Sequence, residues 1–311
     1  MASISARGSR VGMFIQAVRA PFLTASIVPV LVGAALAWRA GVFNGFYLAV
    51  VLLAMICVHL GLNVLNDYTD YRSGNDNRYP KISPFSGGSR MIQRGYLSPA
   101  QTLGLSLAFF AGGIAALLYL GFLRGWAPLW LVLLGLFLAV FYNAPPFRLS
   151  YVGHGLGELA VGLGFGPVIV LGTYYVQVQR LSWEALWAAL PVGLLIAAVV
   201  VINEFPDYEA DKAAHKHTLV VVLGRKRAVW GYIALLVGAY VTVAVGMVWR
   251  VLPVTAALFF VTLPLAVRCM RGVRQFHSDA GELIPTNAAT IQLHLAGGLL
   301  LSLGTVIAGI I

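Results

Sequence analysis

Two short stretches rich in Asn and Asp each follow a long apolar run. The first, NDYTDYRSGND, begins at Asn66, and the second, NEFPDYEAD, begins at Asn203. Asn66 and Asp70 are four residues apart, and Asn203, Asp207 and Asp211 repeat the same spacing. A four-residue step turns an α-helix by about 400°, so the members of each set share a face. Each stretch can therefore direct its oxygen atoms into one cavity.

The residue types in these stretches indicate the chemistry. Carboxylate and amide oxygens without His or Cys at a matching spacing favour a hard cation such as Mg²⁺. Carboxylates this close together repel one another unless cations lie between them, and basic residues in the same loops can bind a diphosphate group. We therefore predict a site for Mg²⁺ and for a substrate with a diphosphate head and an apolar tail. The alternative, that the acids are solvated loop residues paired with Arg and Lys, explains two matching sets at helix ends less well.

Each stretch also contains a residue that interrupts a helix. Gly74 stands where a third Asp would continue the first set, and the sequence Ser73-Gly74-Asn75 predicts that the helix ends there. Asp76 is then expected in a turn. Pro206, inside the second stretch, should kink a helix or begin a new turn, and should free a carbonyl group. Such breaks are tolerated at membrane depth where they line a cavity.

The composition predicts a membrane protein. Of the 311 residues, 59% are hydrophobic and 10% are charged, whereas soluble domains carry about 25% charged residues. A membrane span needs about 20 apolar residues, and the stretches that qualify or nearly qualify are Phe14–Trp38, Phe46–Leu65, Leu103–Leu123, Trp126–Asn143, Leu156–Val176, Trp183–Val201, Ala228–Trp249, Leu252–Val267 and Ala288–Ile311. We expect an all-α polytopic membrane protein with nine transmembrane helices around a central cavity, forming one domain over residues 1–311.

The charges predict the orientation in the membrane. All of the 21 basic residues except Arg39, Arg124, Arg180 and Arg250 lie in the N-terminal segment or in the loops after the even-numbered helices. Basic loops remain in the cytoplasm. The N-terminus and the loops with the Asp-rich stretches are therefore expected to be cytoplasmic and the C-terminus outside, in the plasma membrane of a prokaryote. Most acids lie on the same side, which the topology rule does not require.

Other features of the chain leave alternatives open. The two Asp-rich stretches are separated by four predicted helices, which indicates two related halves, roughly residues 14–150 and 151–311. The Gly-rich fifth helix, GLGELAVGLGFGP, could let a lipid tail approach or could serve ordinary helix packing. His59 and His294 are expected to be hydrogen-bonded packing residues. Cys57 and Cys269 lie in or beside apolar spans and indicate neither a disulfide nor a metal–thiolate site.

The paired stretches, at the ends of the second and sixth of nine predicted helices, resemble those of the UbiA superfamily of intramembrane prenyltransferases. The resemblance covers nearly the whole chain. Within that superfamily the sequence looks most like the 1,4-dihydroxy-2-naphthoate prenyltransferases of menaquinone synthesis. The segments that carry this likeness are RAPFLTASIVPVLVG, FYNAPPFRLSYVGHGLGE and GFGPVIVLGTYYVQ. The ending formed by Gly74 and Asp76 is also shared with that branch.

The resemblance implies a set of site residues. Two Mg²⁺ ions would be bound, one by Asn66, Asp70 and Asp76 and the other by Asn203, Asp207 and Asp211. The implied catalytic residues are Asp67, Asp70 and Asp207, with Asp67 as a metal ligand or an acceptor-side base. The cationic candidates for binding the diphosphate are Arg72, Lys81, Arg90, Arg94 and Lys212. The aromatic side chains that could face an allylic carbocation or the acceptor, or anchor the protein at the membrane interface, are Tyr68, Tyr71, Tyr142 and Phe147.

The resemblance also implies a reaction. A prenyl chain would pass from a polyprenyl diphosphate to an aromatic acceptor, with loss of the acceptor carboxylate as CO₂ in the naphthoate branch. Homogentisate, 4-hydroxybenzoate, a chlorophyllide or a glyceryl lipid are alternative acceptors, and an ion-coupled transporter is an alternative from another class. The expected partners are the two substrates and the lipid bilayer, with no nucleic acid and no obligate protein partner.

Overall fold

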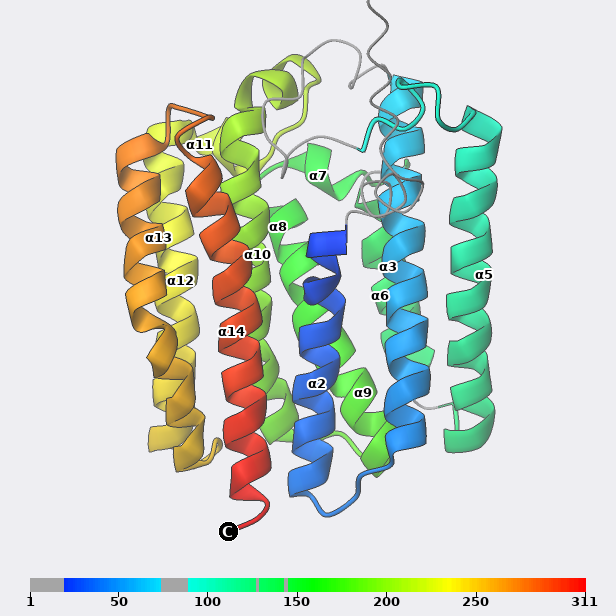
Figure 1. The fold of residues 1–311 in the computed structure, drawn as a ribbon, viewed down its shortest axis with the longest axis vertical. Coiled ribbons are helices and arrows are strands. Elements are labelled where there is room, and N and C mark those ends of the chain that lie inside the picture. The colour runs from blue at the N-terminus through cyan, green and yellow to red at the C-terminus, as the bar shows by residue number, and fades with distance from the viewer. Residues whose placement is uncertain (1–19, 74–88, 127–128, 143–144) are drawn as a thin grey trace, which may run out of the picture.

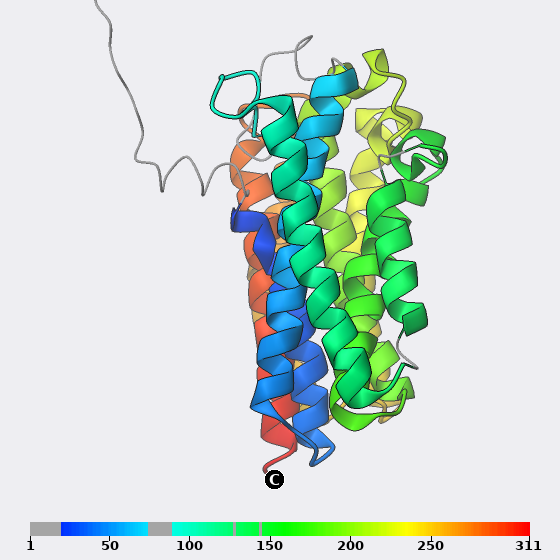
Figure 2. The same ribbon diagram turned by 90° about the vertical axis from the view of Figure 1, so that its right-hand side faces the viewer.

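The computed structural model describes residues 20–73, 89–126, 129–142 and 145–311 and contains no β-strand within these ranges (Figure 1). Its helical elements are η1 (Ala20–Leu23), α2 (Thr24–Arg39), α3 (Gly45–Ser73), α5 (Pro99–Arg124), α6 (Leu129–Phe141), α7 (Leu149–Val152), α8 (Leu156–Leu163), η2 (Gly164–Val168), α9 (Ile169–Val178), α10 (Trp183–Ala213), α11 (Leu219–Leu223), α12 (Arg225–Val248), η3 (Val254–Thr262), α13 (Leu263–Phe276) and α14 (Ile284–Ala308). Most of them run along the long axis of one bundle (Figures 1 and 2).

Seven helical segments of the described chain are long and apolar enough to cross a membrane. They are Gly45–Arg72, Pro99–Arg124, Leu156–Val178, Trp183–Ala213, Arg225–Val248, Val254–Phe276 and Ile284–Ala308, and the shorter apolar helices are Thr24–Arg39 and Trp130–Phe141. These segments overlap the nine predicted stretches one by one. The predicted all-helical, polytopic membrane fold is confirmed, and the protein is an integral membrane protein. Its orientation and its division into two related halves stay predictions.

Helix α10 lies at the centre of the bundle and packs against α12, α14, α8 and η2. The main core joins Leu195 and Phe205 of α10 to Tyr232 of α12 and to Leu293 of α14, all of them buried. Figure 1 shows that α3 and α10 both end at the end of the bundle opposite the C-terminus. Because each Asp-rich stretch lies in the last turns of one of these helices, the fold brings both stretches to the same end.

Helix α10 continues through Pro206 to Ala213, so no helix begins at Pro206. Proline has no N–H to donate to the carbonyl group four residues before it, which is that of Ile202. Asn287 of α14 satisfies this carbonyl: its Nδ2 donates to the oxygen of Ile202 at 3.1 Å and to Oδ1 of Asn203 at 2.7 Å. The prediction that Pro206 frees a carbonyl is confirmed, and the freed group is paired with a neighbouring helix, as a membrane interior requires.

Glycines let η2 pack directly against α10. A Cβ atom at Gly166 would lie 2.7 Å from the Cα atom of Gly193 and 2.9 Å from the carbonyl oxygen of Ala189. Gly162 of α8 is similarly close, since a Cβ atom there would lie 3.1 Å from the carbonyl oxygen of Gly193. Of the two interpretations of the Gly-rich fifth helix, helix packing therefore applies to Gly162 and Gly166. Gly164, between them, lines a cavity.

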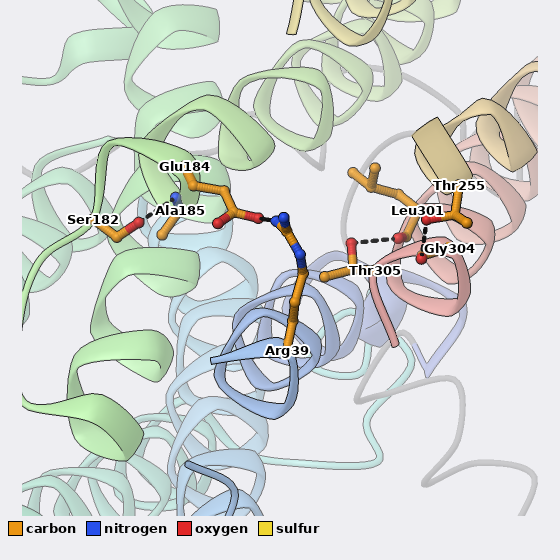
Figure 3. Close-up of polar contacts among 8 residues, drawn as sticks. All are labelled: Arg39, Ser182, Glu184, Ala185, Thr255, Leu301, Gly304 and Thr305. Carbon is orange, nitrogen blue, oxygen red and sulfur yellow. Dashed lines mark hydrogen bonds and ion pairs between the residues drawn. The ribbon is translucent and has the colours of Figure 1, made fainter. Parts of the chain in front are cut away.

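Figure 3 shows polar contacts at the end of the bundle that carries the C-terminus. Arg39, at the end of α2, forms an ion pair with Glu184 in the first turn of α10. The hydroxyl of Ser182 caps the same helix by accepting a hydrogen bond from the N–H of Ala185 at 3.2 Å. Glu184 thus lies at the end of the bundle opposite the Asp-rich stretches. Its ion pair with Arg39 joins the ends of two helices there.

We predict that Gly166→Val lowers the stability of the protein by about 2 kcal/mol, because the added atoms meet backbone that cannot move aside. Gly104→Val is the matched control, since no atom lies within 4 Å of a Cβ placed at Gly104 of α5. Thermal unfolding of the two variants in the same detergent measures the difference. Equal unfolding temperatures would contradict this account of the contact between η2 and α10.

Candidate active site

A cavity of about 550 Å³ lies between α3 and α10. Its walls come from η1, α2, α3, α5, α6, α8, η2, α9 and α10, and no described residue of α11 to α14 lines it. Polar side chains gather where α3 and α10 end, whereas the rest of the wall is mostly apolar and includes Met55, Leu117 and Leu136. Cavities of this volume commonly bind small molecules. This one can take a ligand with a polar head and an apolar tail.

Both Asp-rich stretches line this cavity. Asn66 and Asp70 reach it from α3, and Asn203, Asp207 and Asp211 reach it from α10. The four-residue spacing places each set on the face of its helix that is turned toward the cavity. The expectation that both sets face one cavity is confirmed for these residues, while the Oδ1 atom of Asn203 accepts a hydrogen bond from Asn287 of α14. Asp76 lies outside the described residues.

The donor atoms of this cavity fit Mg²⁺ better than a softer metal. Among the residues that the structure describes, no three His, Cys, Asp or Glu side chains lie close enough together to hold an ion. Mg²⁺ does not need such a cage, since it commonly binds one or two carboxylates and completes its octahedral shell with phosphate oxygens and water. Asp70 on one helix and Asp207 on the other offer this kind of partial site. Their role as metal ligands stays a prediction.

Lys216 brings a positive charge to the polar end of the cavity. His215 turns the chain after α10 with a φ angle of 55°, a left-handed conformation in which His is enriched. The N–H of Lys216 then donates to the carbonyl of Asp211 at 2.9 Å, and its Nζ lies 3.8 Å from the Asp211 carboxylate. Burial lowers the pKa of Lys216, but Asp211 and Asp70 raise it by more, so the pKa lies above its ordinary value. The ammonium group therefore stays charged at neutral pH.

Tyr142, which follows α6, lines the same end. Its carbonyl accepts a hydrogen bond from the N–H of Ser150 at 3.0 Å. Gly157 of α8 packs beside its ring, since a Cβ atom at this glycine would lie at van der Waals distance, 3.4 Å, from the Cε2 atom of Tyr142. Burial raises the pKa of Tyr142; Lys216 lowers it and Glu204 raises it further, with a net rise. The phenol is therefore a neutral hydrogen-bond donor at neutral pH.

Two buried glutamates belong to this region although the sequence did not single them out as site residues. Glu158, in the first turn of α8, accepts a hydrogen bond from the N–H of Leu219 at 2.8 Å. Glu204 of α10 lines the cavity, and neither of its carboxylate oxygens has a hydrogen-bond partner with good geometry in the described chain. The polar end of the cavity thus holds more acidic groups than the two motifs alone supply.

Asp67 does not line the cavity. Its Oδ1 accepts a hydrogen bond from the N–H of Ser89 at 2.8 Å, and its Oδ2 accepts one from the Ser89 hydroxyl. Asp67 is buried, and these contacts hold the segment that carries Arg90, which does line the cavity. The structure thus gives Asp67 a clear positioning contact, while the catalytic role that the resemblance implied stays a prediction.

The other predicted site residues differ in where they lie. Arg90 and Tyr142 line the cavity, but Arg72, Arg94 and Lys212 are exposed and do not. The Nζ of Lys212 lies 5.9 Å from the centre of the Tyr208 ring. The remaining residues outside the cavity wall are Tyr68 and Tyr71, which are half-buried, and Phe147, which is exposed and packs on Phe137 and Phe141. Lys81 lies outside the described residues.

The histidine predictions had different outcomes. The Nδ1 atom of His59 and the hydroxyl of Ser26 share a hydrogen bond of 2.7 Å, which confirms the prediction for His59 and also brings it to the cavity wall. His294 of α14 is buried, and neither ring nitrogen has a hydrogen-bond partner among the described residues. The prediction was therefore wrong in giving His294 such a partner. A hydrogen bond between helices depends on how they pack, and the sequence does not carry that information.

The sequence matches the model of one protein family over most of its length. The model of the UbiA prenyltransferase family matches residues 26–284. The 1,4-dihydroxy-2-naphthoate octaprenyltransferase of Mycobacterium tuberculosis is 36% identical over 88% of this chain and 89% of its own. The 2-carboxy-1,4-naphthoquinone phytyltransferase of Synechocystis is 29% identical over 94% of this chain and 92% of its own.

Solved structures show the same fold at lower identity. The apo structure of a UbiA homologue from Aeropyrum pernix K1 has a TM-score of 0.67 at 18% identity and covers 92% of this chain and 97% of that one. A UbiA homologue from Archaeoglobus fulgidus bound to GPP and Mg²⁺ has a TM-score of 0.61 at 15% identity and covers 93% of this chain and 99% of that one. With the family model matching most of its length, the chain belongs to the UbiA prenyltransferase family and is a prenyltransferase.

Proposed function

We propose that the protein transfers a prenyl chain from a polyprenyl diphosphate to 1,4-dihydroxy-2-naphthoate, with loss of the acceptor carboxylate as CO₂. The observation that carries the proposal is the pairing of Asn66 and Asp70 with Asn203 and Asp207 at the polar end of a mostly apolar cavity. A diphosphate head with its cations fits the polar end, and an isoprenoid tail fits the apolar wall. The choice of acceptor is supported by the naphthoate enzymes among the relatives.

Two Mg²⁺ ions are proposed, one at each Asp-rich stretch. Asn66 and Asp70, with Asp76 from outside the described residues, would hold one ion, and Asn203, Asp207 and Asp211 would hold the other. When bound, Mg²⁺ neutralises charge on the diphosphate as it leaves. A solved homologue carries Mg²⁺ together with a prenyl diphosphate. The residues of this chain provide the matching hard oxygen donors.

The protein groups around these stretches would bind and orient the diphosphate. Arg90 and Lys216 are the described cationic side chains that line the cavity, and each can donate charge-assisted hydrogen bonds to phosphate oxygens. The apolar side chains of α3, α5 and α6 would exclude water from the allylic carbon, which protects a cationic intermediate from hydrolysis. Tyr142, at the border of the polar end, can offer the negative face of its ring to such a cation.

The proposed chemistry balances without a redox partner. The allylic carbon–oxygen bond breaks, and the diphosphate leaves with the bonding electron pair. The ring carbon that bears the carboxylate then forms a bond to the allylic carbon. As the carboxylate departs as CO₂, its bonding pair restores the aromatic ring. The protein therefore has to place the acceptor ring beside the allylic carbon and hold the departing diphosphate.

Other readings have less support. Homogentisate, 4-hydroxybenzoate, a chlorophyllide and a glyceryl lipid are used as acceptor candidates in the test below. An ion-coupled transporter would need a path open to both sides, but among the described residues the acids of the cavity wall come only from the last turns of α3 and α10. The end of the bundle that carries the Asp-rich stretches is proposed to face the cytoplasm, because the basic loops lie at the same end and basic loops remain in the cytoplasm.

We predict that Asp70→Asn and Asp207→Asn each lower the rate of prenyl transfer about 100-fold or more, since each removes a negatively charged ligand for Mg²⁺. The assay combines purified protein, a radiolabelled prenyl diphosphate, Mg²⁺ and each candidate acceptor, and dihydroxynaphthoate should give the most product together with CO₂. Asp279→Asn is the control, because Asp279 is exposed and accepts hydrogen bonds only from nearby N–H groups in its own turn. Full activity of both site variants would rule out the metal assignment.

We predict that Lys216→Met lowers the rate by about 10- to 100-fold, because it removes a buried positive charge beside the proposed diphosphate site. Lys226→Met is the control, since Lys226 is exposed at the start of α12. The Michaelis constant for the prenyl diphosphate should rise in the Lys216 variant, while that for the acceptor changes little. An unchanged Michaelis constant for the diphosphate, with full activity, would exclude Lys216 from this role.

A further inference from the structure

Glu204 is a buried acid whose carboxylate makes, among the described residues, no hydrogen bond or ion pair of good geometry that would stabilise the fold. Its side chain lines the cavity, and the residue is 6% exposed. The backbone of Val220 and the carboxyl group of Glu158 are near neighbours, but neither oxygen of Glu204 has a hydrogen-bond partner with good geometry in the described part of the chain. Leaving a buried polar group unpaired is costly. A ligand that donates a hydrogen bond would remove this cost.

The direction of Glu204 differs from that of the neighbouring Asn203. One residue turns a helix by about 100°, and Asn203 is hydrogen-bonded to Asn287 on α14. Glu204 instead interacts electrostatically with Glu158 of α8 and with Tyr142 after α6. It therefore belongs to the side of the cavity formed by α6 and α8, whereas Asn203 is tied to the side of α14.

Glu158 and the backbone of Val220 lie close to Glu204, but no protein group in the described chain makes a hydrogen bond of good geometry with either oxygen of Glu204. Glu158 accepts a hydrogen bond from the N–H of Leu219, and the ammonium group of Lys216 lies near Asp211. The carboxyl groups of Glu158 and Asp211 act electrostatically on Glu204. A ligand group that donates a hydrogen and carries no negative charge therefore fits beside Glu204 without a cation, whereas a phosphate group would need Mg²⁺ between it and these carboxyl groups.

The apolar part of the cavity wall that comes from α6, α8 and η2 indicates the rest of the ligand. Leu138 and Ala139 of α6, and Ala160, Val161 and Gly164 of α8 and η2, line the same cavity. These side chains are small or flexible and apolar, and they offer a surface for the face of an aromatic ring. A hydroxylated aromatic ring satisfies both conditions at once, because its hydroxyl donates to a carboxyl oxygen while its face packs on the apolar wall.

We infer that Glu204 is a specificity-determining residue that accepts a hydrogen bond from a hydroxyl group of the aromatic acceptor. This inference rests on the proposed function, since it needs an aromatic acceptor, but it holds for any hydroxylated ring that the enzyme uses. Tyr142 borders the same subsite, and the proposed diphosphate site would begin at Lys216, which acts electrostatically on Tyr142. A site built to bind a substrate hydroxyl discriminates strongly against an analogue that lacks it, because the buried protein group is then left unpaired.

The first test compares Glu204→Leu, which removes both acceptor oxygens at similar size, with Glu209→Leu in the full-length enzyme. Glu209 lies on the same helix, its side chain is 63% exposed, and it forms an ion pair with Arg225 at 3.3 Å. The Glu204 variant should raise the Michaelis constant for the acceptor about 10-fold or more and leave that for the prenyl diphosphate and the Mg²⁺ dependence within about twofold. Glu209→Leu should change none of them. An altered Mg²⁺ dependence would make Glu204 a metal ligand instead, and an equal change in every constant would make it structural; either result overturns the inference.

The second test does not depend on the variant folding. Binding of the acceptor to the wild-type enzyme, followed by intrinsic tryptophan fluorescence without a prenyl diphosphate, is compared with binding of an analogue whose hydroxyl groups are methylated. The wild-type enzyme should bind the methylated analogue at least about 10-fold more weakly, and Glu204→Leu should lose this discrimination, since the two changes remove the same hydrogen bond. Equal binding of both ligands by the wild-type enzyme would overturn the inference. If no aromatic ring is prenylated at all, the proposed function fails, which is a separate outcome of the acceptor screen.

Discussion

The structure depends on the burial of several carboxyl groups at one end of a cavity inside an apolar helical bundle. Glu204 and Asp211 of α10 are buried at this end, and Asp70 of α3 and Asp207 of α10 are half-buried beside them in the cavity wall. Carboxylates gathered at one end of a cavity repel one another, and burial costs further free energy because each charged group loses its hydration. Positive charge has to offset both effects. Lys216 supplies one positive charge from the protein. The negative charge that is still unbalanced makes a diphosphate with its divalent cations a suitable occupant.

The rest of the fold holds these groups in place. Asn287 pairs with the carbonyl that Pro206 frees and with the side chain of Asn203. Asp67 holds Ser89, the residue before Arg90, through two hydrogen bonds. The close contact between η2 and α10 sets the distance between the apolar wall and the helix that carries the second motif. These contacts involve α3, α10, η2 and α14, and the hydrogen bonds among them are made within the protein, as a membrane interior requires.

The sequence was sufficient for the features that depend on periodicity. Long apolar runs gave the spans, and the four-residue spacing placed Asn66 with Asp70 and Asn203 with Asp207 in one cavity. The same periodicity explains why Arg72 and Lys212 do not line it: they follow Asp70 and Asp211 by two residues and one residue, which turns the helix by about 200° and 100° away. Lys216 could not be predicted, because its place depends on the turn at His215. Glu204 could not be predicted either, because its importance depends on which helix covers its face of α10.

The two halves of the chain contribute unequally to the cavity wall, although each carries one of the two related motifs. None of the described residues of α12, α13 and α14 lines the cavity, and these helices instead pack behind α10 and against one another. The hydrophobic pattern predicts that such helices are buried in a bundle but not which of them face a cavity. The third of the chain after α11 therefore contributes support, through Asn287 above all, while the earlier helices supply the groups that meet the ligand.

The central claim is that the two motifs hold divalent cations against a diphosphate. Anomalous scattering from crystals grown with Mn²⁺ and an unreactive prenyl thiodiphosphate tests it most directly, since Mn²⁺ accepts the same oxygen ligands as Mg²⁺. The account predicts anomalous peaks about 2.1 to 2.3 Å from carboxylate oxygens of Asp70 and of Asp207, with diphosphate oxygens between them. A diphosphate bound in the cavity by Arg90 and Lys216 alone, with no peak at either motif, would contradict it.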